Sequence, residues 1–247
     1  MYQMPRRMRS QAANRQKSDS GAERLDFPAV LFDLDGTLID SNYHHVIAWE
    51  QALRAAKIVI PTWKIHRRIG MSGKSFLPEL LREIGRGRKS IDIGFLEKAH
   101  DDLFSRKIRD LAPLPGANQL LRHLTRHKIP IAIATTGGRA ATTRLLRQLT
   151  VPARMEIVTG DDVEKAKPSP DIFVTAAQRL NVPIGDCIVV GDSAWDLLAA
   201  GRKNALGVGV MSGGYGEEEL ERAGAFRVYS DPADMLLHLE QLGLPGV

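Results

Sequence analysis

Cysteine is almost absent from this chain: Cys187 is the only one among 247 residues. A single cysteine cannot form an intramolecular disulfide, so the fold must be held by other means. Cys187 lies within an apolar run, where a free thiol packs as a small buried group. We therefore expect a protein of a reducing, cytoplasmic compartment.

Long apolar runs, internal repeats and low-complexity tracts are also absent. No run approaches the roughly 18 apolar residues of a membrane span, so we expect a soluble chain with no membrane partner. No Gly-x-Gly-x-x-Gly unit opens a helix, which removes the usual sign of a dinucleotide site. With 43% hydrophobic and 26% charged residues, the chain has material for one α/β core and a small accessory domain.

The net charge of +5 is unevenly distributed. Residues 1–24 hold six basic and two acidic groups and so account for +4 of it, which leaves the rest nearly neutral. This arm has little apolar content, and we expect it to be disordered. The arm could bind nucleic acid nonspecifically or act as a targeting peptide. Alternatively, translation starts at Met4 or Met8 and part of the arm is never made. We favour an arm without function, either unstructured or untranslated, over both functional alternatives. We expect no specific nucleic-acid partner.

Two acids follow the apolar run 29–32 of Ala-Val-Leu-Phe. Open parallel sheets place their chemistry at the carboxyl ends of strands. Because side chains alternate along a strand, Asp33 and Asp35 are predicted to project to one side and share a site. Gly36 permits a sharp turn, and Thr37 offers donors where an anion can sit.

Three further loops carry polar groups. They are Thr135, Thr136 and Gly137 after the run 131–134, Lys167 before Pro168, and Asp192 to Asp196 after the run 187–191. Taken singly, each has an ordinary explanation: a loop that feeds a helix cap, a solvated lysine, and a capped helix start. Ser169 and Pro170 predict a cap and first turn of a helix.

The ordered series of Asp33-x-Asp35-Gly-Thr, Thr135, Lys167-Pro and Gly-Asp192-Ser-x-x-Asp196 resembles the four motifs of the haloacid dehalogenase superfamily, over roughly residues 27–243. It is most similar to the phosphatase and phosphomutase branch, whose continuation is matched by Asp40-Ser41, His45 and Trp49. The resemblance implies an α/β fold with a doubly wound parallel sheet in a core of residues 25–42 and 113–247. It also implies an inserted, all-helical cap at residues 43–112.

The resemblance assigns a role to each motif residue. Asp33 would attack phosphorus to give an aspartyl phosphate, while Asp35 would protonate the leaving oxygen and later activate water. Thr135 and Lys167 would hold the transferring oxygens. The carboxylates of Asp33 and Asp192 and the backbone carbonyl of Asp35 would hold Mg²⁺. Supporting positions are Asp196, Thr136 and Gly137.

Asp35 also separates branches of the superfamily. Its carbon–halogen hydrolases and phosphonate hydrolases lack an acid at this position, because their leaving groups need no proton. An aspartate here therefore disfavours both activities.

The cap residues that are candidates for substrate binding are Lys74, Gly70, Arg67 and His45. Glycine lets the backbone approach a ligand, and the basic groups suit a carboxylate or second phosphate. For Arg67 a solvated helix end is an equal alternative, and for His45 packing between cap and core is favoured.

Three functions remain open. The first is a Mg²⁺-dependent phosphatase for a small phosphorylated metabolite, such as phosphoglycolate or a sugar phosphate. The second is a sugar phosphomutase similar to β-phosphoglucomutase, and the third and remotest is a non-enzymatic binding module. We expect a monomer or homodimer. Outside the motifs, the pattern predicts a cap loop over 85–94, a last strand over 227–229 and late helices over 217–222 and 232–242.

Overall fold

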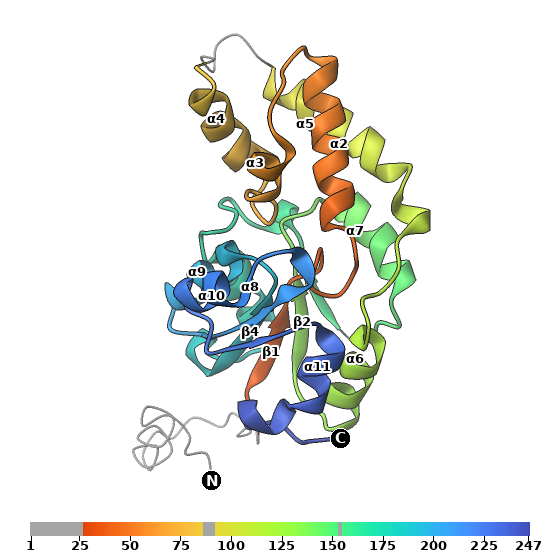
Figure 1. Cartoon of the computed structure of the whole chain (residues 1–247). Coiled ribbons are helices and arrows are strands. Elements are labelled where there is room, and N and C mark those ends of the chain that lie inside the picture. Colours follow the sequence, from red (N-terminus) through yellow and green to blue (C-terminus); the bar gives the residue numbers. More distant parts are fainter. Residues whose placement is uncertain (1–26, 86–91, 153–154) are drawn as a thin grey trace.

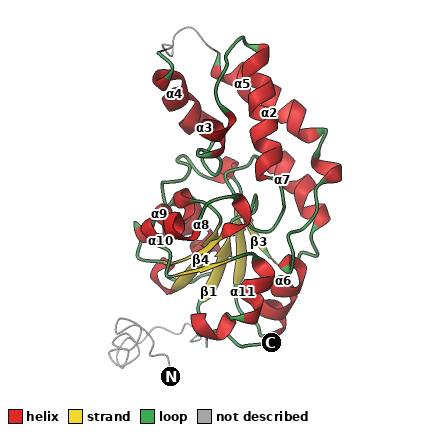
Figure 2. Ribbon diagram, viewed as in Figure 1, coloured by secondary structure: helices red, strands yellow, loops and turns green. Residues whose placement is uncertain are grey.

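A six-stranded parallel sheet forms the centre of the computed structural model, which describes residues 27–85, 92–152 and 155–247 (Figure 1, Figure 2). The strand order is β3-β2-β1-β4-β5-β6, and every pair is parallel. The strands are β1 (Ala29–Phe32), β2 (Ile131–Ala134), β3 (Glu156–Val158), β4 (Cys187–Gly191), β5 (Leu206–Val210) and β6 (Arg227–Tyr229). The predicted doubly wound sheet is confirmed, and its order reverses between β1 and β4. Such a reversal opens a crevice at the carboxyl ends of the two strands. The expected disordered arm, 1–24, lies outside the described residues.

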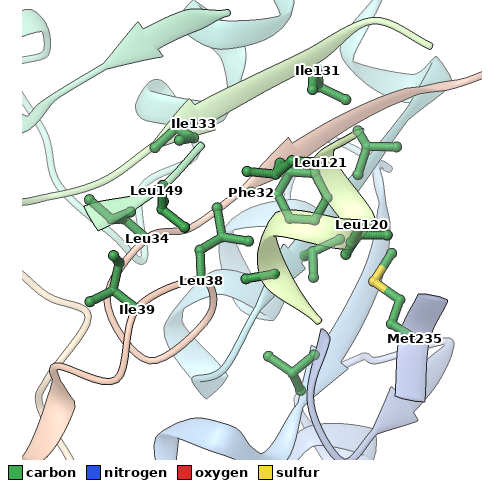
Figure 3. Close-up of a cluster of buried hydrophobic side chains, with 14 of the residues drawn as sticks. Phe32, Leu34, Leu38, Ile39, Leu120, Leu121, Ile131, Ile133, Leu149 and Met235 are labelled. Carbon is green, nitrogen blue, oxygen red and sulfur yellow. The ribbon is translucent and has the colours of Figure 1, made fainter. Parts of the chain in front are cut away.

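Helices cover both faces of the sheet. They are α6 (Ala117–Arg126), α7 (Arg139–Leu145), α8 (Asp171–Arg179), α9 (Ala194–Gly201), α10 (Glu217–Arg222) and α11 (Pro232–Leu237). Alternate residues of β1 enter two cores: Phe32 packs with α6 and α11, and Leu31 packs with α8 and α9. Figure 3 shows the first core, where Phe32 lies among Leu120, Leu121 and Met235. Leu34 continues this side, so the strand's alternation leaves the neighbouring acids facing away from it.

Among the described residues, four α-helices lie between β1 and α6 and form a separate body above the sheet (Figure 1). They are α2 (Asn42–Ala55), α3 (Thr62–His66), α4 (Gly73–Glu83) and α5 (Ile93–Ser105). Their apolar faces meet in a cluster of their own that includes Trp49, Phe76 and Leu96. This is the expected helical cap, and its limits at 43 and 112 stay a proposal. The chain leaves and re-enters the core side by side, since Asp40 N donates to Ala112 O.

Short 3₁₀ helices complete the chain: η2 (Ile108–Asp110), η3 (Leu146–Gln148), η4 (Gly160–Asp162), η5 (Ile184–Asp186), η6 (Met211–Gly213) and η7 (Leu239–Leu242). The expected last strand and the helix over 217–222 are present, whereas the helix over 232–242 is divided into α11 and η7. Within the described ranges, no helix is long and apolar enough to cross a membrane.

Two expected boundaries are wrong. The loop predicted over 85–94 ends earlier, because the Asp92 carboxylate accepts a hydrogen bond from Phe95 N and starts α5 at Ile93; residues 86–91 lie outside the described part. Helix α8 begins at Asp171 with Pro170 as its N-cap, one residue later than expected. The Ser169 hydroxyl donates instead to the Asp171 carboxylate.

Candidate active site

The polar groups predicted at the strand ends meet in the crevice between β1 and β4. Asp33 N donates to Val190 O, and Thr135 N donates to Val158 O, so each motif continues the hydrogen bonding of its strand. The side chains of Asp33, Thr135 and Lys167 are buried, as are those of Asp192 and Asp196. The strand ends, together with the loop that carries Lys167, thus hold five buried polar side chains.

Lys167 joins two of the acids. Its Nζ lies 2.5 Å from Asp33 Oδ1 and 2.7 Å from Asp196 Oδ1, and the side chain is fully buried. Burial alone would lower the pKa of Lys167, but the charges of Asp196 and Asp33 outweigh it and raise that pKa. The ammonium group therefore stays charged beside the carboxylates.

The carboxylates outnumber the cations that face them. Oxygens of Asp33, Asp192 and Asp196 lie within 4.8 Å of one another. Burial, together with the neighbouring acids, raises the pKa of Asp33 to about 7 and that of Asp192 well above its ordinary value. A compact set of buried oxygen donors with excess negative charge fits a hard divalent cation.

Asp192 is held by neutral donors. Its Oδ1 accepts from Thr37 Oγ1 at 3.1 Å, and its Oδ2 accepts from Asn42 Nδ2 at 2.6 Å. Thr37 is therefore used on a carboxylate, not left open for an anion as its position suggested. The backbone of Gly213 packs so closely that a Cβ there would lie 1.7 Å from Asp192 Oδ2. Only glycine leaves room for this carboxylate.

Asp35 has surroundings of a different kind. It is half-buried, and its Oδ1 accepts from Ser41 Oγ at 2.6 Å and lies 3.1 Å from His45 Nε2. Burial would raise the pKa of Asp35, but the charge of His45 and the hydrogen bonds of His45 and Ser41 lower it. Thr135 Oγ1 lies 3.5 Å from Asp35 Oδ2. Ser41 is the N-cap residue of α2, yet its hydroxyl serves Asp35 and makes no cap hydrogen bond.

Two histidines extend from Asp35 into the cap. His45 Nδ1 lies 3.0 Å from His100 Nε2, and His100 Nδ1 lies 3.0 Å from the Asp101 carboxylate. Because a carboxylate only accepts, the His100 proton sits on Nδ1 and its Nε2 accepts from His45 Nδ1. His45 Nε2 is then the ring nitrogen that faces the Asp35 carboxylate, at 3.1 Å. Burial lowers the pKa of His100 to about 4, which keeps this ring neutral.

Asp196 combines a structural and an electrostatic role. Its Oδ2 accepts from Ser193 N and from Ser193 Oγ, the latter at 2.5 Å, in a capping box that starts α9. Its other oxygen faces Lys167. The helix-cap interpretation of this aspartate and the supporting-site interpretation therefore both apply.

The cap contacts these loops through the segment 67–70. Thr136 Oγ1 donates to Gly70 O at 3.1 Å, and Trp195 Nε1 donates to Arg67 O at 3.1 Å. The Arg67 guanidinium lies 2.7 Å from Glu219, so it holds cap to core. Lys74 is exposed at the start of α4, and the Gly137 backbone N–H donates to Thr135 Oγ1. Gly70 and His45 thus lie beside core motifs. Arg67 contacts the fourth motif only through its backbone carbonyl, because its guanidinium pairs with Glu219.

Sequence reasoning missed several residues around the carboxylates. Asn42 and His100 come from cap helices, and Gly213 comes from η6. Asn42 directly follows Ser41 at a helix start, a signal that was available. The spacing of His100 carries no such signal, because its partner is 55 residues away.

Comparison with known proteins agrees with this geometry. Residues 27–202 match the family of haloacid dehalogenase-like hydrolases. The chain is 31% identical to β-phosphoglucomutase of Bacillus subtilis over 86% of this chain and 94% of that one, and 30% identical to hexitol phosphatase A of Escherichia coli over 68% and 76%.

A solved structure shares the whole architecture. The structure of a hydrolase from Pseudomonas syringae is 45% identical, covers 87% of this chain and 99% of its own, and superposes with a TM-score of 0.84. The ordered motifs, the inserted helices and these matches lead to one assignment: the chain belongs to the haloacid dehalogenase-like hydrolases and is an enzyme of their phosphatase and phosphomutase group.

Proposed function

We propose that this chain is a Mg²⁺-dependent phosphatase that hydrolyses a small phosphate monoester through an aspartyl phosphate on Asp33. One observation carries the proposal: Asp33 is buried against Lys167 in a set of acids, while the Asp35 carboxylate nearby lies 3.1 Å from His45 Nε2. A nucleophile, a positive charge and a proton donor are the three things that transfer from a phosphate monoester requires.

The chain's own groups account for both halves of the reaction. Asp33 forms a bond to phosphorus as the bond to the leaving oxygen breaks, and that oxygen takes a proton from Asp35. In the second half, Asp35 accepts a proton from the water that attacks phosphorus and releases Asp33. Lys167 and Thr135 hold the non-bridging oxygens throughout.

Mg²⁺ would be held by the carboxylates of Asp33 and Asp192 and by the Asp35 carbonyl, with Asp196 in support. When bound, it neutralises charge between the phosphate and the nucleophile. Its fit rests on the excess of buried carboxylates and on their oxygen chemistry.

We infer a small phosphorylated metabolite as substrate, and phosphoglycolate and sugar phosphates are the first classes to test. One of the relatives, hexitol phosphatase A of Escherichia coli, is a phosphatase by its name. We further propose a cytoplasmic enzyme that is a monomer or a homodimer.

A second candidate is a sugar phosphomutase. It is favoured by the 31% identity to β-phosphoglucomutase, which extends over almost the whole of that relative. A mutase must protect the aspartyl phosphate from water until a sugar captures it. Assays of β-glucose 1-phosphate with and without a glucose bisphosphate activator separate the two activities: release of inorganic phosphate indicates hydrolysis, and isomerisation indicates the mutase.

The first prediction concerns Asp33. Asp33→Asn keeps the shape of the side chain but removes the nucleophile, so turnover of a panel of phosphorylated metabolites with Mg²⁺ should fall about a thousandfold or more. The circular dichroism spectrum should be unchanged. Turnover of the variant within about tenfold of wild type would place the nucleophile elsewhere.

The second prediction separates two lysines. Lys167→Ala should depress turnover of every substrate by a similar factor, because Lys167 faces the reacting group. Lys74→Ala should reorder the panel, with the largest losses for substrates that carry a second anionic group. Lys98→Ala, an exposed lysine of α5, is the matched control and should leave the panel unchanged. A uniform loss from Lys74→Ala would contradict its role in substrate selection.

A further inference from the structure

A basic cavity lies apart from the carboxylate cluster, where the segment returning from the cap meets α7 and η3. Its volume is about 510 Å³, and it is lined by Ser105, Arg106, Ile108, Arg109, Arg144, Arg147 and Gln148. None of the candidate active-site residues lines it. Its two walls are joined by a hydrogen bond from Gln148 Nε2 to Ile108 O.

The cavity's charge is unbalanced. Four of its seven lining residues are arginines, and none is acidic. Elsewhere in the described part of the chain, six arginines form ion pairs with carboxylates: Arg54, Arg67, Arg68, Arg139, Arg179 and Arg222. Others, such as Arg202, do not, but those are not gathered around one hollow. Within the described part of the chain, no carboxylate pairs with any arginine of the cavity, and Arg144 donates only to a carbonyl of its own helix.

We propose that this cavity binds a small anion with two or more phosphate groups, such as the diphosphate portion of a nucleotide. Planar guanidinium groups match phosphate oxygens through paired hydrogen bonds, and several of them gathered around one hollow suit a multiply charged ligand. The bound anion also relieves the mutual repulsion of the four cations. The four arginines are exposed, and an open hollow of this size accommodates a small molecule, whereas a nucleic-acid strand requires an extended basic track.

The ligand would touch both parts of the enzyme. Ser105 to Arg109 belong to the segment that returns from the cap, and Arg144 to Gln148 belong to helices that follow the Thr135 loop of the core (Figure 1). An anion held by both walls joins cap to core at a point that the substrate does not occupy.

Calorimetric titration of the full chain tests the site. The protein is freed of metal on a chelating resin, because a soluble chelator is itself a polyanion, and is titrated with inorganic pyrophosphate or ADP. The expected result is binding that weakens with added salt and that falls tenfold or more in Arg144→Gln/Arg147→Gln. The matched variant Arg122→Gln/Arg126→Gln removes the same charge from exposed positions on α6 and should bind as wild type does.

The two probes identify the part of the ligand that is recognised. Equal affinity for pyrophosphate and ADP assigns the site to the phosphates alone, and tighter binding of ADP adds a contact to the nucleoside; both support the proposal. No binding at millimolar ligand, equal losses in the two double variants, or binding of a single-stranded RNA but of neither small probe would overturn it.

Discussion

At the scale of single residues, one ammonium group sets the electrostatics of the carboxylate cluster. Lys167 contacts Asp33 and Asp196, whereas Asp192 receives hydrogen bonds from the neutral donors Thr37 and Asn42. Neutral donors orient a carboxylate but do not cancel its charge. Asp192 is therefore the acid that gains most from a bound cation.

The buried ring of His100 leads to a prediction about stability at the same scale. The ordinary pKa of histidine, 6.5, is lowered to about 4 here by burial. Below pH 6.5 the unfolded chain binds a proton that the folded chain refuses, so stability falls as the pH drops toward 4. Between about pH 7.5 and pH 5 this loss should be about 2 kcal/mol.

Urea denaturation at the two pH values measures it. His100→Gln should lose less stability than wild type over this interval by that amount, and the exposed His238→Gln should behave as wild type does. Equal losses for wild type and His100→Gln would show that His100 does not resist protonation.

At the scale of elements, the segment 67–70 fastens the cap over the loops of the core. Gly70 has a φ of +97°, its carbonyl accepts from Thr136, and a Cβ at this position would lie 2.8 Å from Ser193 Oγ. Gly85 has a φ of +72°, but among the described residues no atom beyond its chain neighbours lies within 4 Å of its would-be Cβ. The two glycines thus share a backbone requirement and differ in their surroundings.

Alanine at these glycines separates backbone strain from cap contact. Gly85→Ala should lower stability by about 1 kcal/mol, since it places a side chain in the left-handed region. Gly70→Ala should lower it by at least as much, because the new methyl group also meets Ser193 Oγ. Only Gly70→Ala should also lower turnover, by about tenfold, because it displaces the cap from the reacting groups. Steady-state kinetics beside thermal denaturation provide the comparison. Equal turnover of the two variants would show that the contact of Gly70 with the core does not affect catalysis.

The elements also show what a sequence can predict. Apolar runs such as 131–134 and 187–191 indicate strands. In a parallel sheet the carboxyl ends of all strands lie at the same edge, so the residues that follow these runs are predicted to lie close together. Arg67, a candidate for substrate binding with a solvated helix end as an equal alternative, pairs with Glu219, and His100 reaches Asp35 through His45. Such contacts depend on how cap helices pack on the core, which local periodicity does not encode.

At the scale of the whole molecule, stability and metal binding are linked through the buried acids. Repulsion among Asp33, Asp192 and Asp196 opposes folding until a cation offsets it. The metal-free protein should therefore be less stable than the Mg²⁺-loaded protein.

Asp192→Asn tests this link. The amide keeps the side-chain size but removes one buried charge, so in chelator the variant should melt about 3 °C or more above wild type. Added Mg²⁺ should raise the melting temperature of wild type and have little effect on the variant. Asp40→Asn, at an exposed position next to the first motif, should respond as wild type does. A variant that melts below wild type in chelator would mean that Asp192 stabilises the metal-free fold.

The two segments that connect the cap to the core run side by side: Ile39 forms a β-bridge with Pro113, and Leu114 N donates to Leu38 O. The cap is therefore inserted into the core at a single place. A folded segment with neighbouring ends can replace another there by in-frame exchange, provided that core contacts such as those of Phe104 and Ile108 are kept. Over evolutionary time, or in a designed chimera, the enzyme can acquire a new substrate by replacing a module while Asp33 and its partners stay unaltered.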